Sequence, residues 1–165
     1  MKIYIDTEFT DLVGIVCDIK LISAGFVAES AEEFYFELTN YYEEGECSSF
    51  VCEAVLPHLN HAKHGMPEDQ ACLRLKAWVE SFSVPVELCS DAPGYDWGLL
   101  YDLFERNNSW PTNLVKKPVN VNSHKVQQGI ESYFECQPMA IRHHALWDAR
   151  ALAIAAIFFK RNQVS

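Results

Sequence analysis

Three segments of the chain carry acidic side chains at positions where they could do chemistry together. Asp6 and Glu8 stand one residue apart in IYIDTEF, behind a run that predicts a β-strand. Because side chains alternate along a strand, both acids are expected on the same face. Asp96 stands at the start of a predicted helix, and Asp148 in the first turn of the last predicted helix. Four acids at strand ends and helix starts could converge on one pocket.

Each of these acids also has an ordinary structural explanation. A strand end often carries a solvated acid pair, and the field at a helix N-terminus favours a carboxylate by about 0.3–1 kcal/mol. His143, with four residues between it and Asp148, is equally uninformative by itself. The conjunction is what predicts a site, because a cluster of like charges in one pocket is costly unless cations neutralise it.

The side-chain types select a metal and a reaction. Carboxylate oxygens are hard ligands, which prefer Mg²⁺ or Mn²⁺ to zinc. Two such ions, roughly 3.5–4 Å apart, can activate a water on one side of a phosphodiester and stabilise the leaving oxygen on the other. A neutral histidine such as His143 could take the proton from that water, because imidazole titrates near neutral pH. The pattern therefore predicts phosphodiester hydrolysis with two divalent ions.

The bulk composition bounds the kind of protein. With 165 residues, 49% of them hydrophobic and 22% charged, we expect a single globular domain over residues 1–165. A formal net charge of −10 argues against indiscriminate binding to a phosphate backbone, although a site with its own cations inverts the local charge. Six scattered cysteines, the lack of an apolar run of about 18 residues and the lack of a signal-peptide pattern predict a cytoplasmic protein.

The hydrophobic pattern predicts an α/β fold. Three strands with short connections come first and form an antiparallel meander, after which helices and strands alternate. The predicted strands cover 2–6, 21–29, 32–38, 84–89 and 114–121, and the predicted helices cover 49–56, 69–82, 95–106, 126–134 and 146–160. Pro118 places the fifth strand at a sheet edge. The last helix is apolar nearly all round and is expected to pack on a mixed sheet flanked by helices.

Three motifs resemble those of a known enzyme family. DTEF at 6–9, YDWGLL at 95–100 and HHALWDA at 143–149 are similar, in order and character, to the motifs of the DEDDh branch of the DEDD (DnaQ-like) 3′–5′ exonucleases. That family has a ribonuclease-H-like fold and includes proofreading exonuclease subunits, RNase T and oligoribonuclease. The His-x4-Asp spacing distinguishes this branch from the tyrosine branch. The same comparison selects His143 over His144 and Asp96 over Asp91.

The resemblance implies a role for each matching residue. Asp6, Glu8 and Asp148 would hold the Mg²⁺ or Mn²⁺ ion that carries the nucleophilic water. Asp6 would also touch a second ion, which Asp96 would support partly through water. His143 would be the general base. The catalytic set implied by the resemblance is therefore Asp6, Glu8, Asp96, His143 and Asp148, and its four acids are the metal ligands.

The segment around the first motif is implied to bind the terminal nucleotide. The backbone of Thr7 and Glu8 would lie near the terminal 3′-hydroxyl, with Phe9 in the same substrate site, and Leu12 would press on the terminal base. The usual motif has glycine where this chain has Asp11. An acid there could narrow the nucleotide pocket or point to solvent.

The resulting hypothesis is a metal-dependent 3′–5′ exonuclease that releases nucleoside 5′-monophosphates from single-stranded ends. RNA is favoured over DNA, because the short chain is most similar to compact bacterial 3′–5′ exoribonucleases, and the resemblance also implies a homodimer. Three alternatives stay open: a DNA-directed exonuclease, a ribonuclease-H-type endonuclease, which would not require His143, and a module that binds nucleotides without hydrolysing them. No contact to a ribose 2′-hydroxyl is evident in the sequence.

Overall fold

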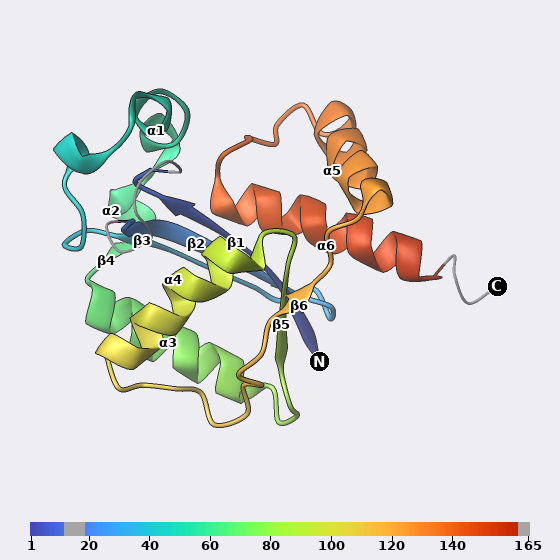
Figure 1. Cartoon of the computed structure of the whole chain (residues 1–165), viewed down its shortest axis with the longest axis horizontal. Coiled ribbons are helices and arrows are strands. Elements are labelled where there is room, and N and C mark those ends of the chain that lie inside the picture. The colour runs from blue at the N-terminus through green and yellow to red at the C-terminus, as the bar shows by residue number, and fades with distance from the viewer. Residues whose placement is uncertain (12–18, 162–165) are drawn as a thin grey trace.

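A mixed six-stranded sheet organises the chain in a computed structural model that describes residues 1–11 and 19–161. The strand order is β4-β3-β2-β1-β5-β6, so the first strand lies inside the sheet (Figure 1). β1 (Lys2–Phe9), β2 (Leu21–Ala28) and β3 (Glu33–Leu38) form an antiparallel meander. The expected α/β fold class, with a meander as its first half, is confirmed.

Parallel pairing completes the sheet on both sides of the meander. β5 (Glu87–Ser90) pairs with β1, and β6 (Val119–Asn120) pairs with β5. β4 (Gly65–Met66) pairs with β3 at the opposite edge. Because β1 and β5 are parallel neighbours, their carboxyl ends lie at the same edge of the sheet. The first acidic motif and the start of the helix that carries Asp96 both lie at that edge.

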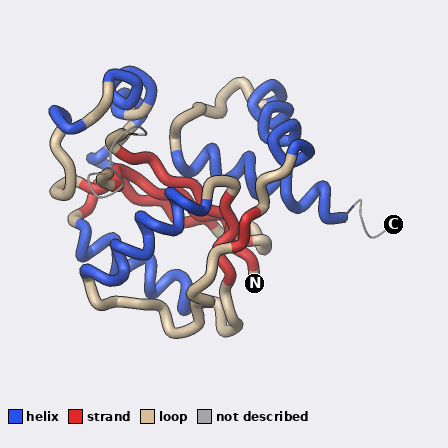
Figure 2. The backbone as a smooth tube through the Cα atoms, viewed as in Figure 1, coloured by secondary structure: helices blue, strands red, loops and turns tan. Residues whose placement is uncertain are grey.

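Helices cover both faces of this sheet (Figure 2). The helices are α1 (Ser49–Ala54), α2 (His61–His64), α3 (Glu68–Ser81), α4 (Pro93–Arg106), α5 (His124–Cys136) and α6 (Ala145–Arg161), with 3₁₀ turns at Glu44–Glu46 and Leu56–His58. Among the described residues, none of these helices has the length and apolarity needed to cross a membrane.

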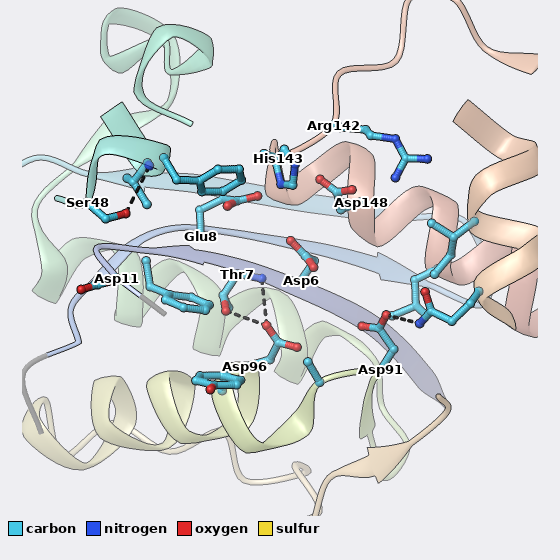
Figure 3. A pocket seen from close by; sticks show the side chains of 18 of the residues that line it. Asp6, Thr7, Glu8, Asp11, Ser48, Asp91, Asp96, Arg142, His143 and Asp148 are labelled. Carbon is cyan, nitrogen blue, oxygen red and sulfur yellow. Dashed lines mark hydrogen bonds between the residues drawn. The ribbon is translucent and has the colours of Figure 1, made fainter. Parts of the chain in front are cut away.

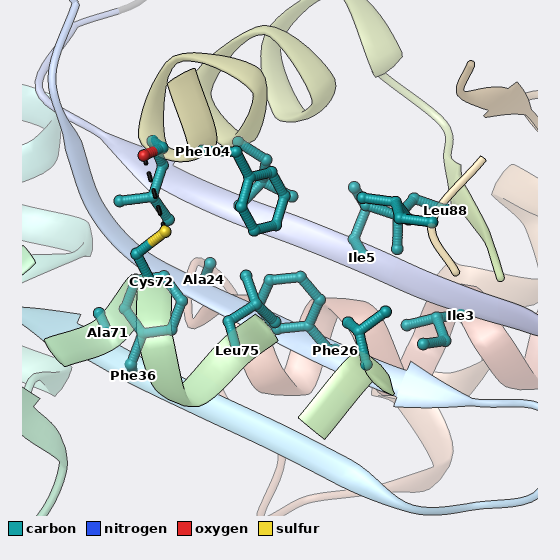
Figure 4. Close-up of a cluster of buried hydrophobic side chains, with 14 of the residues drawn as sticks. Ile3, Ile5, Ala24, Phe26, Phe36, Ala71, Cys72, Leu75, Leu88 and Phe104 are labelled. Carbon is teal, nitrogen blue, oxygen red and sulfur yellow. Dashed lines mark hydrogen bonds between the residues drawn. The ribbon is translucent and has the colours of Figure 1, made fainter. Parts of the chain in front are cut away.

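One face of the sheet packs on α3 and α4 around the larger hydrophobic core (Figure 4). Phe26 and Phe36 of the meander are fully buried there, with Leu75 of α3 and Phe104 of α4. Odd-numbered residues of β1, such as Ile5, face this core, as alternation along the strand requires. The even-numbered residues are left to the opposite face, where the acids lie.

The opposite face packs on α6, which approaches the sheet closely at one point. Tyr4 of β1 is buried there against Leu152 of α6. Gly25 of β2 leaves room for the start of the helix, because a Cβ atom at this position would lie 2.5 Å from the Cα atom of Leu146. Only glycine permits this approach, and it brings the first turn of α6 down onto the sheet.

The first strand is longer than its hydrophobic pattern predicts. A strand over 2–6 was expected, whereas β1 continues to Phe9. Thr7 and Glu8 pair with Ala24 and Ser23 of β2, and this pairing extends the strand through the acidic motif. Asp6 and Glu8 are therefore held by sheet hydrogen bonding rather than by a loop.

The predicted strand over 114–121 is wrong in extent. Only Val119–Asn120 forms a strand, together with one isolated bridge between Val86 and Leu114. Between them the amide of Lys117 donates to the carbonyl of Val115 in a tight turn, and Pro118 has no amide hydrogen for a ladder. The predicted strand over 84–89 likewise begins later, at Glu87.

Two other segments differ from expectation. The stretch between the predicted helices 49–56 and 69–82, for which no helix or strand was predicted, contains α2 and β4, because Gly65 and Met66 pair with the end of β3. The last helix packs on the sheet as expected, but its apolar side chains are not all covered, since Ile154 is 54% exposed and Phe158 60% exposed. Both residues line a groove that α6 forms with α5.

Candidate active site

A pocket of about 590 Å³ lies at the edge where β1 ends, between α1, the start of α4, α5 and the start of α6 (Figure 3). Its lining is strongly acidic. The carboxylic acids that line it are Asp6, Glu8, Asp11, Asp91, Asp96, Glu131 and Asp148. Arg142 is the one lysine or arginine among the described lining residues.

Three carboxylates meet in the middle of this pocket. Asp6, Glu8 and Asp148 each offer an oxygen, and these oxygens lie within 4.8 Å of one another. Two of the acids are brought together by alternation along β1. Asp148 arrives from the first turn of α6, which the close approach at Gly25, opposite Asp6 in the β1–β2 register, sets beside them.

Burial strongly perturbs these three acids. Burial first, and then repulsion by Asp148 and the other acids, raises the pKa of Asp6 well above its usual value. The same causes raise the pKa of Glu8 to about 8. Burial also raises the pKa of Asp148 to about 7, against the opposing effect of the His144 amide, which donates to Asp148 Oδ2 at 3.0 Å. Without a cation, the three carboxylates cannot all be ionised cheaply.

Asp96 enters from α4 and is held tightly by its neighbours. It is 3% exposed, and its Oδ1 accepts hydrogen bonds from the amide of Thr7 (3.1 Å) and from the Thr7 hydroxyl (2.6 Å). The Ser90 hydroxyl donates to its other oxygen. Burial raises the pKa of Asp96 to about 6, and the hydroxyl donors oppose that rise. Asp96 is thus tied to β1 and to the end of β5 on the flank of the three-acid cluster.

The two adjacent histidines have different surroundings. His143 lines the pocket, its ring edge-on to Phe50 at 4.9 Å between centroids, and its backbone φ of 58° lies in the left-handed region. The ring of His144 instead stacks on Tyr35 at 4.7 Å. Partial burial, followed by the charge of Arg142, lowers the pKa of His143 and favours its neutral form.

Aromatic residues line the pocket beyond Glu8. Phe9 stacks on Tyr95 of α4 with ring centroids 5.4 Å apart and planes 9° apart. Phe50 of α1 also lines the pocket and is 47% exposed. Asp11, the acid at the position where the usual motif has glycine, also lines the pocket. Leu12, the residue expected to press on the terminal base, lies outside the described residues.

Several pocket residues were missed by the sequence reasoning. Asp91 lines the pocket, where Gln127 of α5 donates to its Oδ2 at 2.8 Å. Phe50 was likewise not assigned to the site, and neither was Ser90, which lies behind the pocket lining and donates to Asp96. The position of Ser90 and Asp91 at a strand end before YDWGLL was the one available signal, since residues at the carboxyl ends of parallel strands often form sites. Nothing local distinguishes Phe50 or Gln127 from other helix residues.

The donor set fits hard divalent cations. Three carboxylates with oxygens within 4.8 Å offer only oxygen ligands, which suit Mg²⁺ or Mn²⁺. Burial, with repulsion from neighbouring acids added, raises the pKa of Glu8, so its ionised form is unfavourable in the pocket. A bound cation would stabilise that ionised form. Asp96 already accepts hydrogen bonds at both oxygens, which leaves it better suited to support an ion than to hold one alone.

Comparison with known proteins identifies the fold. The sequence matches no protein-family model and no curated protein. Among solved structures, the nuclease domain of 3′hExo, a DEDDh family member, bound to rAMP, is 15% identical with a TM-score of 0.66, covering 98% of this chain and 92% of that one. E. coli exonuclease I in complex with a dT13 oligonucleotide is 15% identical with a TM-score of 0.61, covering 98% and 41%.

A further exonuclease I, from Methylocaldum szegediense, is 14% identical with a TM-score of 0.60. That match covers 98% of this chain and 41% of the exonuclease I chain. At these identities the likeness establishes a common fold. The chain shares the ribonuclease-H-like fold of these structures, a mixed sheet flanked by helices, as the resemblance of its motifs implies.

Proposed function

We propose that this protein is a metal-dependent 3′–5′ exonuclease that releases nucleoside 5′-monophosphates. The observation that carries the proposal is the meeting of Asp6, Glu8 and Asp148, from two distant segments, in a pocket that His143 also lines. The fold shared with the nuclease domain of 3′hExo, and the names of the other neighbours, support the same activity. We propose that residues 1–165 act as a single exonuclease domain.

Each acid has a part in this proposal. Asp6, Glu8 and Asp148 would hold one divalent cation, and Asp6 with Asp96 would support a second. When bound, the cations polarise the attacking water and neutralise charge that develops on the leaving oxygen. The hydrogen bonds from Thr7 and Ser90 orient the Asp96 carboxylate, so that it need not reorganise during the reaction.

His143 is the proposed general base. Its lowered pKa, caused by partial burial and by Arg142, keeps an imidazole nitrogen available for a proton at neutral pH. The water oxygen bonds to phosphorus as His143 takes its proton, and the bond between phosphorus and O3′ breaks. O3′ takes up a proton from solvent water and becomes the new 3′-hydroxyl, the terminal nucleotide leaves with its 5′-phosphate, and His143 returns its proton to solvent.

The terminal nucleoside is proposed to lie beyond Glu8, toward the aromatic residues. The backbone of Thr7 and Glu8 would lie near its 3′-hydroxyl, and the stacked pair of Phe9 and Tyr95 would face its base. We propose RNA as the preferred polymer, with a homodimer as the assembly. Both follow from the family resemblance. We also propose a cytoplasmic location, where the free thiols of Cys47 and Cys136 would stay reduced.

The experiment is a time course on matched single-stranded RNA and DNA oligomers, each labelled at the 5′ or the 3′ end. We expect Mg²⁺ or Mn²⁺ to support release of mononucleotides from the 3′ end, faster on RNA, and EDTA to abolish it. Internal fragments would indicate an endonuclease, and a faster DNA reaction would reverse the proposed preference.

Asp6→Ala is the variant that tests the site. It should abolish hydrolysis while the far-UV circular dichroism stays native, because it removes one of several repelling carboxylates. Glu53→Ala, which removes an acid of α1 that does not line the pocket, is the matched control and should retain activity. An Asp6→Ala protein that digests oligomers at the normal rate would refute the assignment.

A further inference from the structure

We propose that Arg142 binds the phosphate group one nucleotide upstream of the scissile phosphate, and that Glu131 occupies Arg142 until substrate replaces it. This inference rests on the proposed exonuclease function and deepens it, because it defines the shortest substrate that the site binds well. Its chemistry is the pairing of a guanidinium with a phosphate monoanion or dianion.

The charge of the pocket singles out Arg142. Seven carboxylic acids line the cavity, and Arg142 is the one lysine or arginine among its described lining residues. Two divalent cations would serve the scissile phosphate at the three-acid cluster. Any further phosphate that enters the pocket meets acidic side chains unless it lies beside Arg142. Among the lining residues that the structure describes, the guanidinium is thus the lysine- or arginine-type cation that a second phosphate could meet.

The placement of Arg142 fits the upstream phosphate. In Figure 3, Ser48 and Asp11 mark one end of the pocket and Arg142 and Asp91 the other, with the metal-binding acids between them. The aromatic side chains of Phe9 and Phe50 belong to the Asp11 and Ser48 end by their place in the chain. A 3′-terminal base at that end puts the scissile phosphate at the acids and the next phosphate toward Arg142.

The present partner of Arg142 is one that a phosphate could replace. Arg142 forms an ion pair with Glu131 of α5, and its guanidinium lies 4.4 Å from the centroid of the Phe134 ring. The side chains of Arg142 and Glu131 are 42% and 60% exposed, so the pair lies at the rim of the pocket. Exposed ion pairs are weakly held, whereas a phosphate can accept two parallel hydrogen bonds from a guanidinium.

Arg142 lies just before α6 and is held against α5 by a contact that does not involve Glu131. The ring of Phe134 supports the guanidinium from α5, so that Arg142 can release Glu131 without losing its position. Arg142 directly precedes His143, and its charge already acts on His143 and on Asp148. A phosphate bound to Arg142 would therefore be close to the scissile phosphate, at the distance of the next nucleotide of the substrate.

Two dinucleotides provide the test. NpN contains only the scissile phosphate, whereas pNpN carries a second phosphate at its 5′ end, which occupies the upstream position. We expect wild-type protein with Mg²⁺ to cleave pNpN with a kcat/KM about tenfold higher than that for NpN, the usual effect of one charge-assisted hydrogen-bonded contact. Most of the difference should be in KM.

Arg142→Gln should reduce the pNpN-to-NpN ratio of kcat/KM to near one, and Glu131→Gln should increase it, because the competing carboxylate is gone. Arg106→Gln is the matched control. Arg106 also forms an ion pair, with Glu68, and also lies over a ring, that of Tyr41, but it does not line the pocket. Its ratio should equal that of the wild type.

Equilibrium binding gives a readout independent of turnover. Isothermal titration calorimetry with dinucleotides that have a methylene in place of the bridging O3′ oxygen should show the same tenfold preference and the same loss in Arg142→Gln. Equal loss on both dinucleotides would overturn the proposal, because Arg142 would then act on the scissile phosphate. A wild-type protein that cleaves both without preference would also overturn it, while leaving the exonuclease function intact.

Discussion

Gly25 of β2 lies directly opposite Asp6 of β1, and the start of α6 packs on it so closely that a Cβ atom would lie 2.5 Å from the Cα atom of Leu146. This contact links the first acidic motif to the last one. The backbone of α6 cannot come as near to any larger residue, and Asp148 stands in the first turn of that helix. The arrangement of the three carboxylates therefore depends on a residue that has no side chain.

Gly25→Ala should separate Asp148 from Asp6 and Glu8. The added methyl group meets backbone rather than a flexible side chain, so the helix must move, at a cost of about 1–3 kcal/mol in the free energy of unfolding. We expect a folded protein with Mn²⁺ affinity reduced at least about tenfold, as measured by isothermal titration calorimetry. Gly98→Ala is the control, because nothing lies within 4 Å of its added Cβ atom. Unchanged Mn²⁺ affinity in Gly25→Ala would contradict this account of the site.

The metal-free protein should lose stability as the pH rises. Burial, reinforced by mutual repulsion, raises the pKa of Glu8 to about 8, burial raises that of Asp148 to about 7, and that of Asp6 rises well above its usual value. The folded state therefore binds more protons than the unfolded state, and the free energy of unfolding falls as the pH rises. The loss should be spread between about pH 4, near the unfolded pKa values, and about pH 8.

Urea unfolding in EDTA at pH 5, 6.5 and 8 measures this dependence. Asp6→Asn should be more stable than the wild type at pH 8 and should show a shallower decline, because one carboxylate of the cluster no longer ionises. Added Mg²⁺ should restore wild-type stability at pH 8 and do much less for Asp6→Asn. A stability that rises with pH in EDTA would show that the carboxylates do not repel one another as described.

His143 and His144 should respond differently to substitution. His143→Ala removes the proposed base and should lower kcat by about 10²–10⁴-fold, with little change in the melting temperature. His144→Phe keeps a ring that can stack on Tyr35, and the amide that donates to Asp148 is unchanged, so kcat should change by less than about threefold. Single-turnover rates with saturating Mg²⁺ separate the two. The opposite order of effects would reassign the base to His144.

Thr7→Val tests how Asp96 is held. The substitution preserves shape but removes the hydroxyl that donates to Asp96 Oδ1 at 2.6 Å in a buried environment. Loss of this charge-assisted bond should lower the free energy of unfolding by about 1.5–3 kcal/mol. It should also raise the Mg²⁺ concentration for half-maximal activity, measured by metal titration. Thr39→Val, at a threonine beyond the end of β3, is the matched control. An unchanged metal requirement would remove Asp96 from the second ion site.

Local patterns predicted the elements better than their limits. Alternation in Ile3, Tyr4 and Ile5 correctly indicated a strand with two different faces, yet β1 runs on to Phe9 because β2 supplies partners for Thr7 and Glu8. The predicted strand around Pro118 shrank to two residues for the converse reason, since a residue without an amide hydrogen interrupts the ladder. Pairing partners are distant in sequence and leave no local signal.

The candidate site divides in the same way. The order and spacing of three motifs were enough to list the five candidate residues, which are Asp6, Glu8, Asp96, His143 and Asp148. The side chains that hold these five residues in place could not be predicted from the sequence. Thr7 and Asp96 are 89 residues apart in the chain and share a hydrogen bond, and the ion pair of Arg142 with Glu131 joins a loop to a separate helix.

By itself, the sequence determined which chemical groups this protein has and their order: carboxylates on a strand and at two helix starts, with a histidine before the last. Composition and spacing are local properties, and they are sufficient for that. Only the tertiary structure decided how near the groups come to one another. That distance depends on the close approach of α6 to Gly25, on the reach of the sheet to Phe9 and on the hydrogen bonds around Asp96, all of which join segments far apart in the chain.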